Sequence, residues 1–202
     1  PTGAAYFKRL GISPSLYTIR SCANGRIDYV GASFANQGEY IVEGWDMFVD
    51  YSTEFGPVNF DAYIDYSKVT DYGGAPFIGS TAHQNMVGFD GLPAVRYNLG
   101  IRVSWENYGL GITNRHIGDF AMGSTTNADS TQDKAGPYQD KYDTIDIQAT
   151  ADFDKYGVIS LGIINAADKD PLPDRGGQNY DSYTGLYDNR GKITYVKWKL
   201  SF

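Results

Sequence analysis

The chain has 202 residues, of which 42% are hydrophobic and 15% aromatic, and its formal net charge is -7 at pH 7. That length suits one sizeable domain with a hydrophobic core. The acidic balance argues against nucleic acid as a partner, because no basic stripe is available to neutralise phosphates. A helical membrane protein is excluded as well, because no run approaches the roughly 18 apolar residues that a spanning helix needs.

Residues 1–25 show no sustained periodicity and contain many turn-forming residues, so we expect loop there, with at most a strand remnant. The one cysteine, Cys22, is either a free thiol or half of a disulfide whose partner is missing. Within residues 26–202, several separate runs alternate apolar and polar side chains. This period of two is typical of β-strands whose two faces meet different environments. The predicted strands are Arg26–Phe34, Ile41–Tyr51, Val58–Ser67, Arg96–Glu106, Leu110–Ile117, Ile145–Phe153, Val158–Asn165 and Gly191–Phe202.

The connections between these strands alternate in length. Those at 52–57, 106–109 and 154–157 are short, whereas those at 68–92, 118–140 and 166–190 are long and polar. Outer-membrane β-barrels combine short periplasmic turns with long extracellular loops, and their strands alternate apolar and polar residues. We therefore predict an all-β fold, an antiparallel transmembrane β-barrel segment of about eight strands. A secreted glycan-binding β-sandwich also alternates and is the alternative for a protein in water.

The chain resembles the C-terminal part of the barrel of TonB-dependent outer-membrane receptors. In that family a strand ends in an Asn-Leu-Phe-Asp-like box, and the final strand opens near Gly-Arg and closes on Phe. Here the matching positions are Asn165-Ala-Ala-Asp168, Asn189-Arg190-Gly191 and Phe202, with Ala-Ala in place of Leu-Phe and the Gly-Arg order inverted. Farther back, Asn36-Gln-Gly38 and Glu43-Gly44-Trp45-Asp46 resemble the family's Asn-x-Gly and Gly-Val-Asp element.

The resemblance implies a Gram-negative outer-membrane importer that takes up a ferric siderophore, cobalamin, another chelate or an oligosaccharide. Such receptors have a 22-stranded barrel and an N-terminal plug that contacts TonB, so residues 26–202 would be the C-terminal portion of a barrel whose plug is absent here. The terminal strand, with Val196, Trp198, Leu200 and Phe202, is similar to the signal read by the barrel-assembly machinery. A self-contained eight-stranded barrel with a structural or passive role is the alternative.

Candidate binding residues fall in two groups. Loop tips carry Tyr72, Phe77, Tyr138, Tyr180 and Tyr183, which we expect to select the ligand. Arg96 and Arg102 share the polar side of one strand, where they would meet an anionic ligand or a plug carboxylate, or form salt bridges with acids such as Asp146 and Asp152. The predicted anchors at the membrane interface are Trp45, Tyr51, Tyr66, Trp105 and Trp198.

Catalytic motifs are missing from the sequence. The chain has only two histidines, His83 and His116, and no nucleophile elbow, metal-spaced cluster or phosphate loop. The spacing of Asp168, Asp170 and Asp174 suggests calcium, but a matching Gly and Glu pattern is lacking, which favours a plain acidic loop. We expect no enzymatic activity, cofactor or metal, and we expect lipid and a small ligand as partners.

Overall fold

The computed structural model describes residues 19–21, 27–30, 40–75, 80–89, 91–129, 131–173 and 186–200. Several residues singled out from the sequence lie outside the described residues, namely Cys22, Asn36, Gln37, Gly38, Phe77, Asp174, Tyr180, Tyr183 and Phe202. The chain divides into two compact units. One combines Pro1–Val42, Asp71–Met86 and Thr126–Asp133, and the other combines Glu43–Thr70, Val87–Thr125 and Lys134–Phe202. No helix in the described part of the chain is long and apolar enough to cross a membrane.

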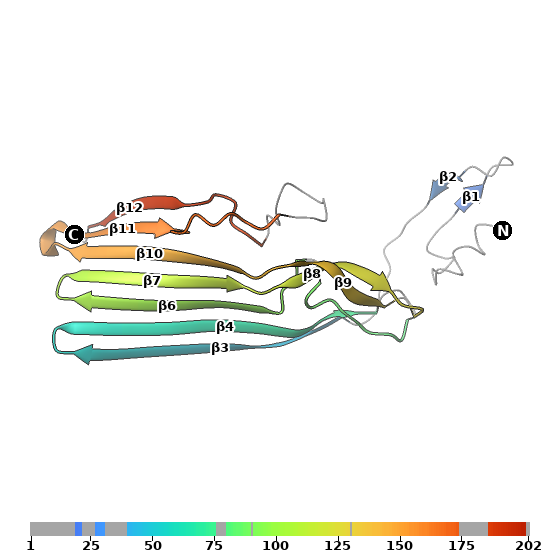
Figure 1. The fold of residues 1–202 in the computed structure, drawn as a ribbon, viewed down its shortest axis with the longest axis horizontal. Coiled ribbons are helices and arrows are strands. Elements are labelled where there is room, and N and C mark those ends of the chain that lie inside the picture. The colour runs from blue at the N-terminus through green and yellow to red at the C-terminus, as the bar shows by residue number, and fades with distance from the viewer. Residues whose placement is uncertain are drawn as a thin grey trace. The chain divides into compact units, whose positions relative to one another are not determined.

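The second unit is built on one large antiparallel sheet (Figure 1). Its strands follow the order β12-β11-β10-β7-β6-β4-β3, in which β3 and β12 are the two edges. The strands are β3 (Tyr40–Phe55), β4 (Val58–Gly74), β6 (Val95–Trp105), β7 (Tyr108–Ile117), β10 (Tyr142–Asp152), β11 (Val158–Ile164) and β12 (Ile193–Lys199). The prediction of an all-β antiparallel fold is confirmed. Over the described residues the sheet is open, and no closed barrel is found.

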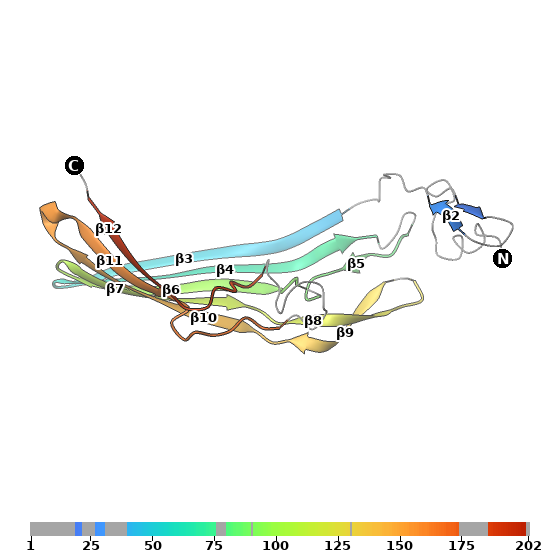
Figure 2. The same ribbon diagram turned by 90° about the horizontal axis from the view of Figure 1, so that it is seen from above.

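Short turns lie at one end of this sheet (Figures 1 and 2). Gly56 has φ 61° between β3 and β4, and Glu106 has φ 48° between β6 and β7. The third turn, between β10 and β11, contains the short 3-10 helix Asp154–Tyr156 and ends at Gly157, with φ 88°. Positive φ values suit the reversal of strands that twist to the right. The first turn was predicted at 52–57, but strand pairing continues to Phe55, so the turn is shorter than expected.

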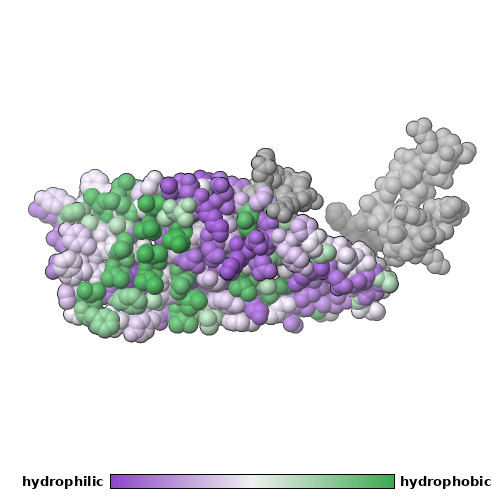
Figure 3. All heavy atoms as spheres, viewed as in Figure 1, coloured by the Kyte–Doolittle hydropathy of each residue, from purple (hydrophilic) through white to green (hydrophobic). Residues whose placement is uncertain are grey.

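One face of the sheet is apolar and remains exposed. Its aliphatic band spans six strands, and most of its cross-strand pairs join apolar residues, although Asn114 lies opposite Leu99 and Ile145, and Thr194 lies opposite Ile163. The members of the aliphatic band are Ala62, Ile64, Leu99, Ile101, Val103, Leu110, Ile112, Ile145, Ile147, Ala149, Leu161, Ile163 and Val196. Ile101, Leu110 and Val196 are 46%, 50% and 72% exposed. Figure 3 shows hydrophobic side chains gathered over the strands near the short turns and hydrophilic ones toward the long connections.

Two rows that contain aromatic rings border the aliphatic band. The turn-side row, made of Trp105, Tyr108, Ala151, Ile159 and Trp198, follows successive cross-strand pairs. The connection-side row lies nearer the long connections and is made of Trp45, Tyr66, Tyr97, His116 and Asp143. Its rings stack in succession, with centroids 5.2, 6.4 and 4.4 Å apart. His116 Nδ1 lies 2.7 Å from the Asp143 carboxylate. The apolar face is thus bordered by rings at both ends.

The opposite face of the sheet is polar and carries two ring-over-glycine contacts. Tyr63 is paired across the strands with Gly100, and Tyr195 is paired with Gly162. In both pairs the tyrosine ring occupies the space that a Cβ on the glycine would need. The Tyr195 hydroxyl also accepts a hydrogen bond of 2.9 Å from the Gln148 amide. These glycines therefore provide room for a ring, which explains glycine in the middle of two strands.

The buried core of the second unit lies among the connections. Val87, Phe89, Phe120, Ala121, Tyr142 and Tyr187 are each less than a tenth exposed. The Ala121 amide donates a hydrogen bond of 2.8 Å to the Gly88 carbonyl, and the Lys134 ammonium lies over the Phe89 ring. Residues 118–140, predicted as a polar loop, form the hairpin β8 (Phe120–Thr126) and β9 (Gln132–Gln139). That loop prediction is wrong, because beyond Phe120 and Ala121 most of the hairpin is exposed or half-buried on both faces and shows no apolar alternation.

The first unit contains β1 (Ile19–Ser21) paired with β2 (Ile27–Val30). It also contains β5 (Gln84–Asn85), which pairs with the last two residues of β4. The predicted loop 68–92 therefore begins later than expected, since β4 extends to Gly74. His83 Nε2 lies 2.8 Å from Asp71, and the rings of Tyr40 and Tyr72 meet edge to face at 5.3 Å. Tyr72 thus packs against another aromatic ring.

Candidate functional site

A cavity of about 410 Å³ opens on the second unit, next to the long connections. Polar-face residues from β4, β6, β7 and β10 line its wall, and the segment 186–191 that precedes β12 closes another side. Its polar lining includes Asp65, Ser67, Arg96, Asn98, Arg115, His116, Thr144, Asn165, Tyr187 and Asp188. The volume falls within the range of small-molecule sites, about 300–1,000 Å³. We regard this cavity as the candidate binding site.

The segment before β12 is held against the sheet by two tyrosines. The rings of Tyr142 and Tyr187 lie 4.9 Å apart, and both side chains are 4% exposed. The Tyr142 hydroxyl donates a hydrogen bond of 2.9 Å to the Lys169 carbonyl, and the Lys169 ammonium lies over the Tyr142 ring. Asn165, with φ 52°, exchanges two further hydrogen bonds with Lys169. The cavity therefore has a rigid wall on its connection side.

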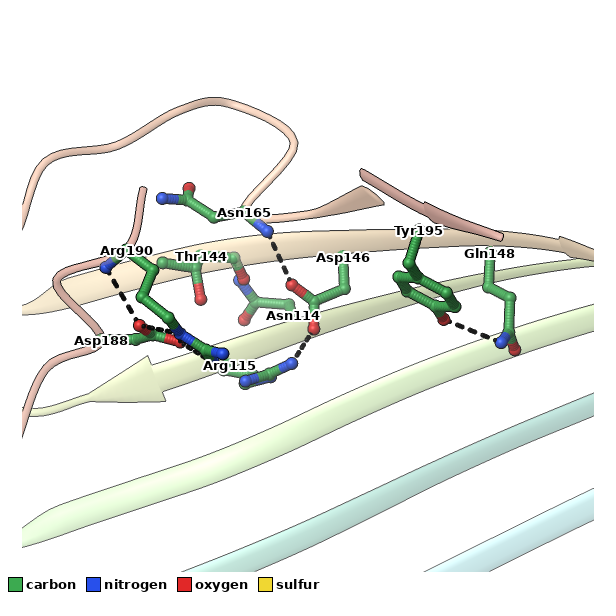
Figure 4. Close-up of polar contacts among 9 residues, drawn as sticks. All are labelled: Asn114, Arg115, Thr144, Asp146, Gln148, Asn165, Asp188, Arg190 and Tyr195. Atoms are coloured by element: carbon green, nitrogen blue, oxygen red, sulfur yellow. Dashed lines mark hydrogen bonds and ion pairs between the residues drawn. The ribbon is translucent and has the colours of Figure 1, made fainter. Parts of the chain in front are cut away.

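Most charged groups around the cavity are neutralised by a partner (Figure 4). Arg115 forms an ion pair with Asp146. The other carboxylate oxygen of Asp146 accepts a hydrogen bond from the backbone N–H of Asn165, with a nitrogen to oxygen distance of 2.9 Å. Arg190 donates to both oxygens of Asp188, with nitrogen to oxygen distances of 2.9 and 2.7 Å. This hydrogen bonding holds the pKa of the Asp188 carboxyl at about 2, well below its usual value. The carboxylates of Asp146 and Asp188 therefore each have an arginine as ion-pair partner.

Arg96 differs from these residues because no carboxylate among the described residues lies within ion-pair distance of it. It belongs to β6, opposite Ser67 of β4 and Ile117 of β7, and it lines the cavity. The Ser67 hydroxyl is already engaged, since it donates to Asp46 at 2.6 Å. Burial raises the pKa of Tyr187, and the nearby positive charge of Arg96 opposes that rise.

Two polar atoms beside the cavity are buried without a hydrogen-bond partner in the described structure, the Tyr187 hydroxyl and the Gln139 amide nitrogen. The Gln139 side chain lies close enough to the Tyr187 hydroxyl to lower its pKa, so these two groups are neighbours. An unpaired buried polar group costs about 1–3 kcal/mol.

The residues predicted for binding are dispersed. Arg96 lines the cavity, whereas Arg102 lies farther along the same face, near Gly109, and is not part of the lining. Tyr138 is 59% exposed on β9, and Tyr72 contacts Tyr40, so neither lines the cavity. The sequence prediction missed Arg115, Tyr187 and Asp188. Alternation along β7 would have placed Arg115 on the polar face.

The predicted anchor residues occupy both ends of the apolar face. Trp45 and Tyr66 belong to the connection-side row, whereas Trp105 and Trp198 belong to the turn-side row. Tyr51 contacts Phe60 at the turn end, with ring centroids 6.4 Å apart. The Trp198 indole donates a hydrogen bond of 2.8 Å to the Tyr156 carbonyl. Among the described residues no cluster of His, Cys, Asp or Glu could hold a metal ion.

Comparison of the chain with models of protein families, with curated proteins and with solved structures finds no match.

The Asp188 and Arg190 pair predicts an acid-sensitive contact. Because the folded pKa of Asp188 lies below its ordinary value of 3.8, its contribution to stability is complete above pH 4 and is lost as the pH falls toward 2. An NMR titration of 13C-labelled aspartate should find one carboxyl with a midpoint near 2. Arg190→Gln should move that midpoint toward 3.8, and an unchanged midpoint in this variant would contradict the assignment.

Proposed function

We propose that this chain forms part of the wall of an outer-membrane β-barrel in a TonB-dependent uptake receptor. The observation that supports it best is the two-sided sheet, with an exposed aliphatic band on one face and paired charges on the other. An apolar patch of that extent is rare on a protein in water, where it promotes association. In a bilayer the same face contacts lipid tails, and the polar face lines the interior of the barrel.

The dimensions of the apolar face agree with this proposal. The nine residues from Tyr97 to Trp105 on β6 join the connection-side row to the turn-side row. A tilted strand crosses the hydrocarbon layer with about 9–11 residues. Aromatic rings are enriched at both interfaces of a membrane, where the ring is apolar and its edge is polar. The two aromatic rows then lie at the two interfaces, and the barrel would span the Gram-negative outer membrane.

The connections between the strands support the receptor function in this proposal. Outer-membrane barrels have short turns on the periplasmic side and longer loops outside, and the described sheet has the same asymmetry. The candidate cavity lies beside the long connections, where a ligand arriving from outside would be captured. Energy coupling through TonB and a plug domain rests on the family resemblance alone. The two open sheet edges, β3 and β12, leave places for further barrel strands.

Membrane insertion is tested by diluting the urea-unfolded chain into phosphatidylcholine vesicles and, in parallel, into buffer without lipid. We expect the chain to float with the vesicles, with its open edges β3 and β12 pairing between copies, and its strands to resist added protease while the long connections are cleaved. In buffer alone we expect aggregation, because the aliphatic band has no lipid to cover it. A soluble monomer in buffer that stays away from vesicles would contradict the proposal and favour a secreted sandwich.

The receptor and the self-contained small barrel are separated by the mass of the natural protein. An antibody raised against the β8–β9 hairpin would detect the mature protein in outer-membrane fractions. A receptor with plug and full barrel must be several times heavier than the 22.3 kDa of this chain, whereas a self-contained barrel must be close to that mass.

A further inference from the structure

We propose that the cavity binds a small ligand through an oxyanion group, a carboxylate or a phosphate, and that Arg96 is the residue that holds it. This inference rests on the proposed function in one respect, because it places the site on the inner face of the barrel. Arg96 lies on β6, directly opposite Ser67, at the wall of the 410 Å³ cavity.

The charge balance of the cavity singles out Arg96. Three arginines surround the site, and two of them are neutralised, Arg115 by Asp146 and Arg190 by Asp188. Arg96 has no ion-pair partner among the described residues, and its side chain is exposed. A guanidinium presents two parallel N–H groups that match the two oxygens of a carboxylate or phosphate. The cavity therefore offers one unused oxyanion-binding group.

The remaining lining suits a polar ligand of limited size. Asn98 and Thr144 offer amide and hydroxyl groups to the cavity, and Tyr187 contributes an aromatic ring. Asp65 is the one carboxylate of the lining for which the described residues show no ion pair. It lies on β4 opposite Asn98, one pair away from Arg96 on the same face. A ligand that also carries hydroxyl groups would satisfy both Arg96 and Asp65, because the hydroxyls can donate to the carboxylate.

The direct test is isothermal titration calorimetry on the full chain, refolded in detergent, with citrate and inorganic phosphate as separate probes. Citrate presents carboxylates and an alcohol, whereas inorganic phosphate presents phosphoryl oxygens and P–OH groups, so the two titrations distinguish a carboxylate from a phosphate ligand. We expect saturable binding of at least one probe. Arg96→Gln should weaken that binding at least tenfold, equivalent to about 1.4 kcal/mol.

Arg102→Gln is the matched control. Arg102 belongs to the same strand and the same face as Arg96, but it lies outside the cavity lining. The Arg102→Gln variant should change the affinity for the probe less than twofold. Equal losses in both variants would show that the probe responds only to the overall charge of the polar face. Equal losses would overturn the inference, and so would the absence of saturable binding of both probes to the unmodified chain. Circular dichroism spectra verify that each variant is folded before titration.

The two proposals fail in different ways. If the chain inserts into vesicles but neither probe binds, the membrane assignment stands and the oxyanion site is wrong. If a probe binds through Arg96 while the chain stays soluble and apart from lipid, the oxyanion site stands and the membrane assignment is wrong.

Discussion

Replacing Ile112 with arginine is expected to lower the free energy of unfolding in vesicles by about 2–4 kcal/mol. Ile112 belongs to the aliphatic band, where it pairs with Ile101 on one side and Ile147 on the other, and it is 46% exposed. An arginine at this position would have to place its charge among lipid tails. On a sheet surrounded by water the same change at an exposed position would matter little, about 0.5 kcal/mol or less.

Thr113→Arg provides the control for this prediction, because the neighbouring residue points to the opposite face. Thr113 pairs with Asp146 across β7 and β10, so an added positive charge there meets water and a carboxylate. We expect its unfolding free energy to remain within about 0.5 kcal/mol of the unmodified chain. Urea titrations in vesicles, followed by tryptophan fluorescence, measure both variants. Similar values for the two substitutions would contradict a lipid-facing aliphatic band.

Gly162→Ala is expected to destabilise the folded chain by about 1–3 kcal/mol, the usual cost of overpacking. The new methyl group would occupy the space of the Tyr195 ring, which is held in place by the hydrogen bond from Gln148. The ring would have to move away, and that hydrogen bond would be lost. The strand pair of β11 and β12 would then lose a contact next to an open edge of the sheet.

Gly111→Ala tests whether the effect belongs to the ring contact or to any glycine in the sheet. A Cβ at Gly111 would meet only ordinary contacts, at 3.8 and 3.9 Å. Because alanine loses less backbone freedom on folding, this variant should be unchanged or more stable by up to about 1 kcal/mol. The same urea titration compares the two variants. An equal loss in both would mean that the Tyr195 ring has no special role at Gly162.

The strands of the large sheet were predictable because each is apolar on one face and polar on the other. Val58–Ser67 shows this alternation without interruption, and the structure has a strand from Val58 to Gly74. The end of β4 was not predictable, since pairing continues beyond the aliphatic band, where alternation no longer marks the faces. The hairpin of β8 and β9 was missed for the same reason. Alternation of apolar and polar residues identifies a strand only where its two faces meet different environments. It does not identify a strand that has water on both sides.

The candidate site was predictable only in part. Arg96 was identified because it lies on the polar side of a regular strand, and Asp146 was named as a partner for Arg96 or Arg102. In the structure Asp146 pairs with Arg115, because β10 is the neighbour of β7 and its register brings Thr144 opposite Arg115. Neither the neighbour nor the register can be derived from one sequence. The burial of Tyr187 against Tyr142 likewise depends on residues that are 45 positions apart.

The placement of the three tryptophans makes the chain suitable for fluorescence spectroscopy without an added label. Trp105 and Trp198 belong to the turn-side row, whereas Trp45 stacks on Tyr66 in the connection-side row. A water-soluble quencher confined to one side of a vesicle reaches one row before the other. Single replacements of these indoles by phenylalanine would then assign each emission to its row and give the direction in which the chain crosses the bilayer.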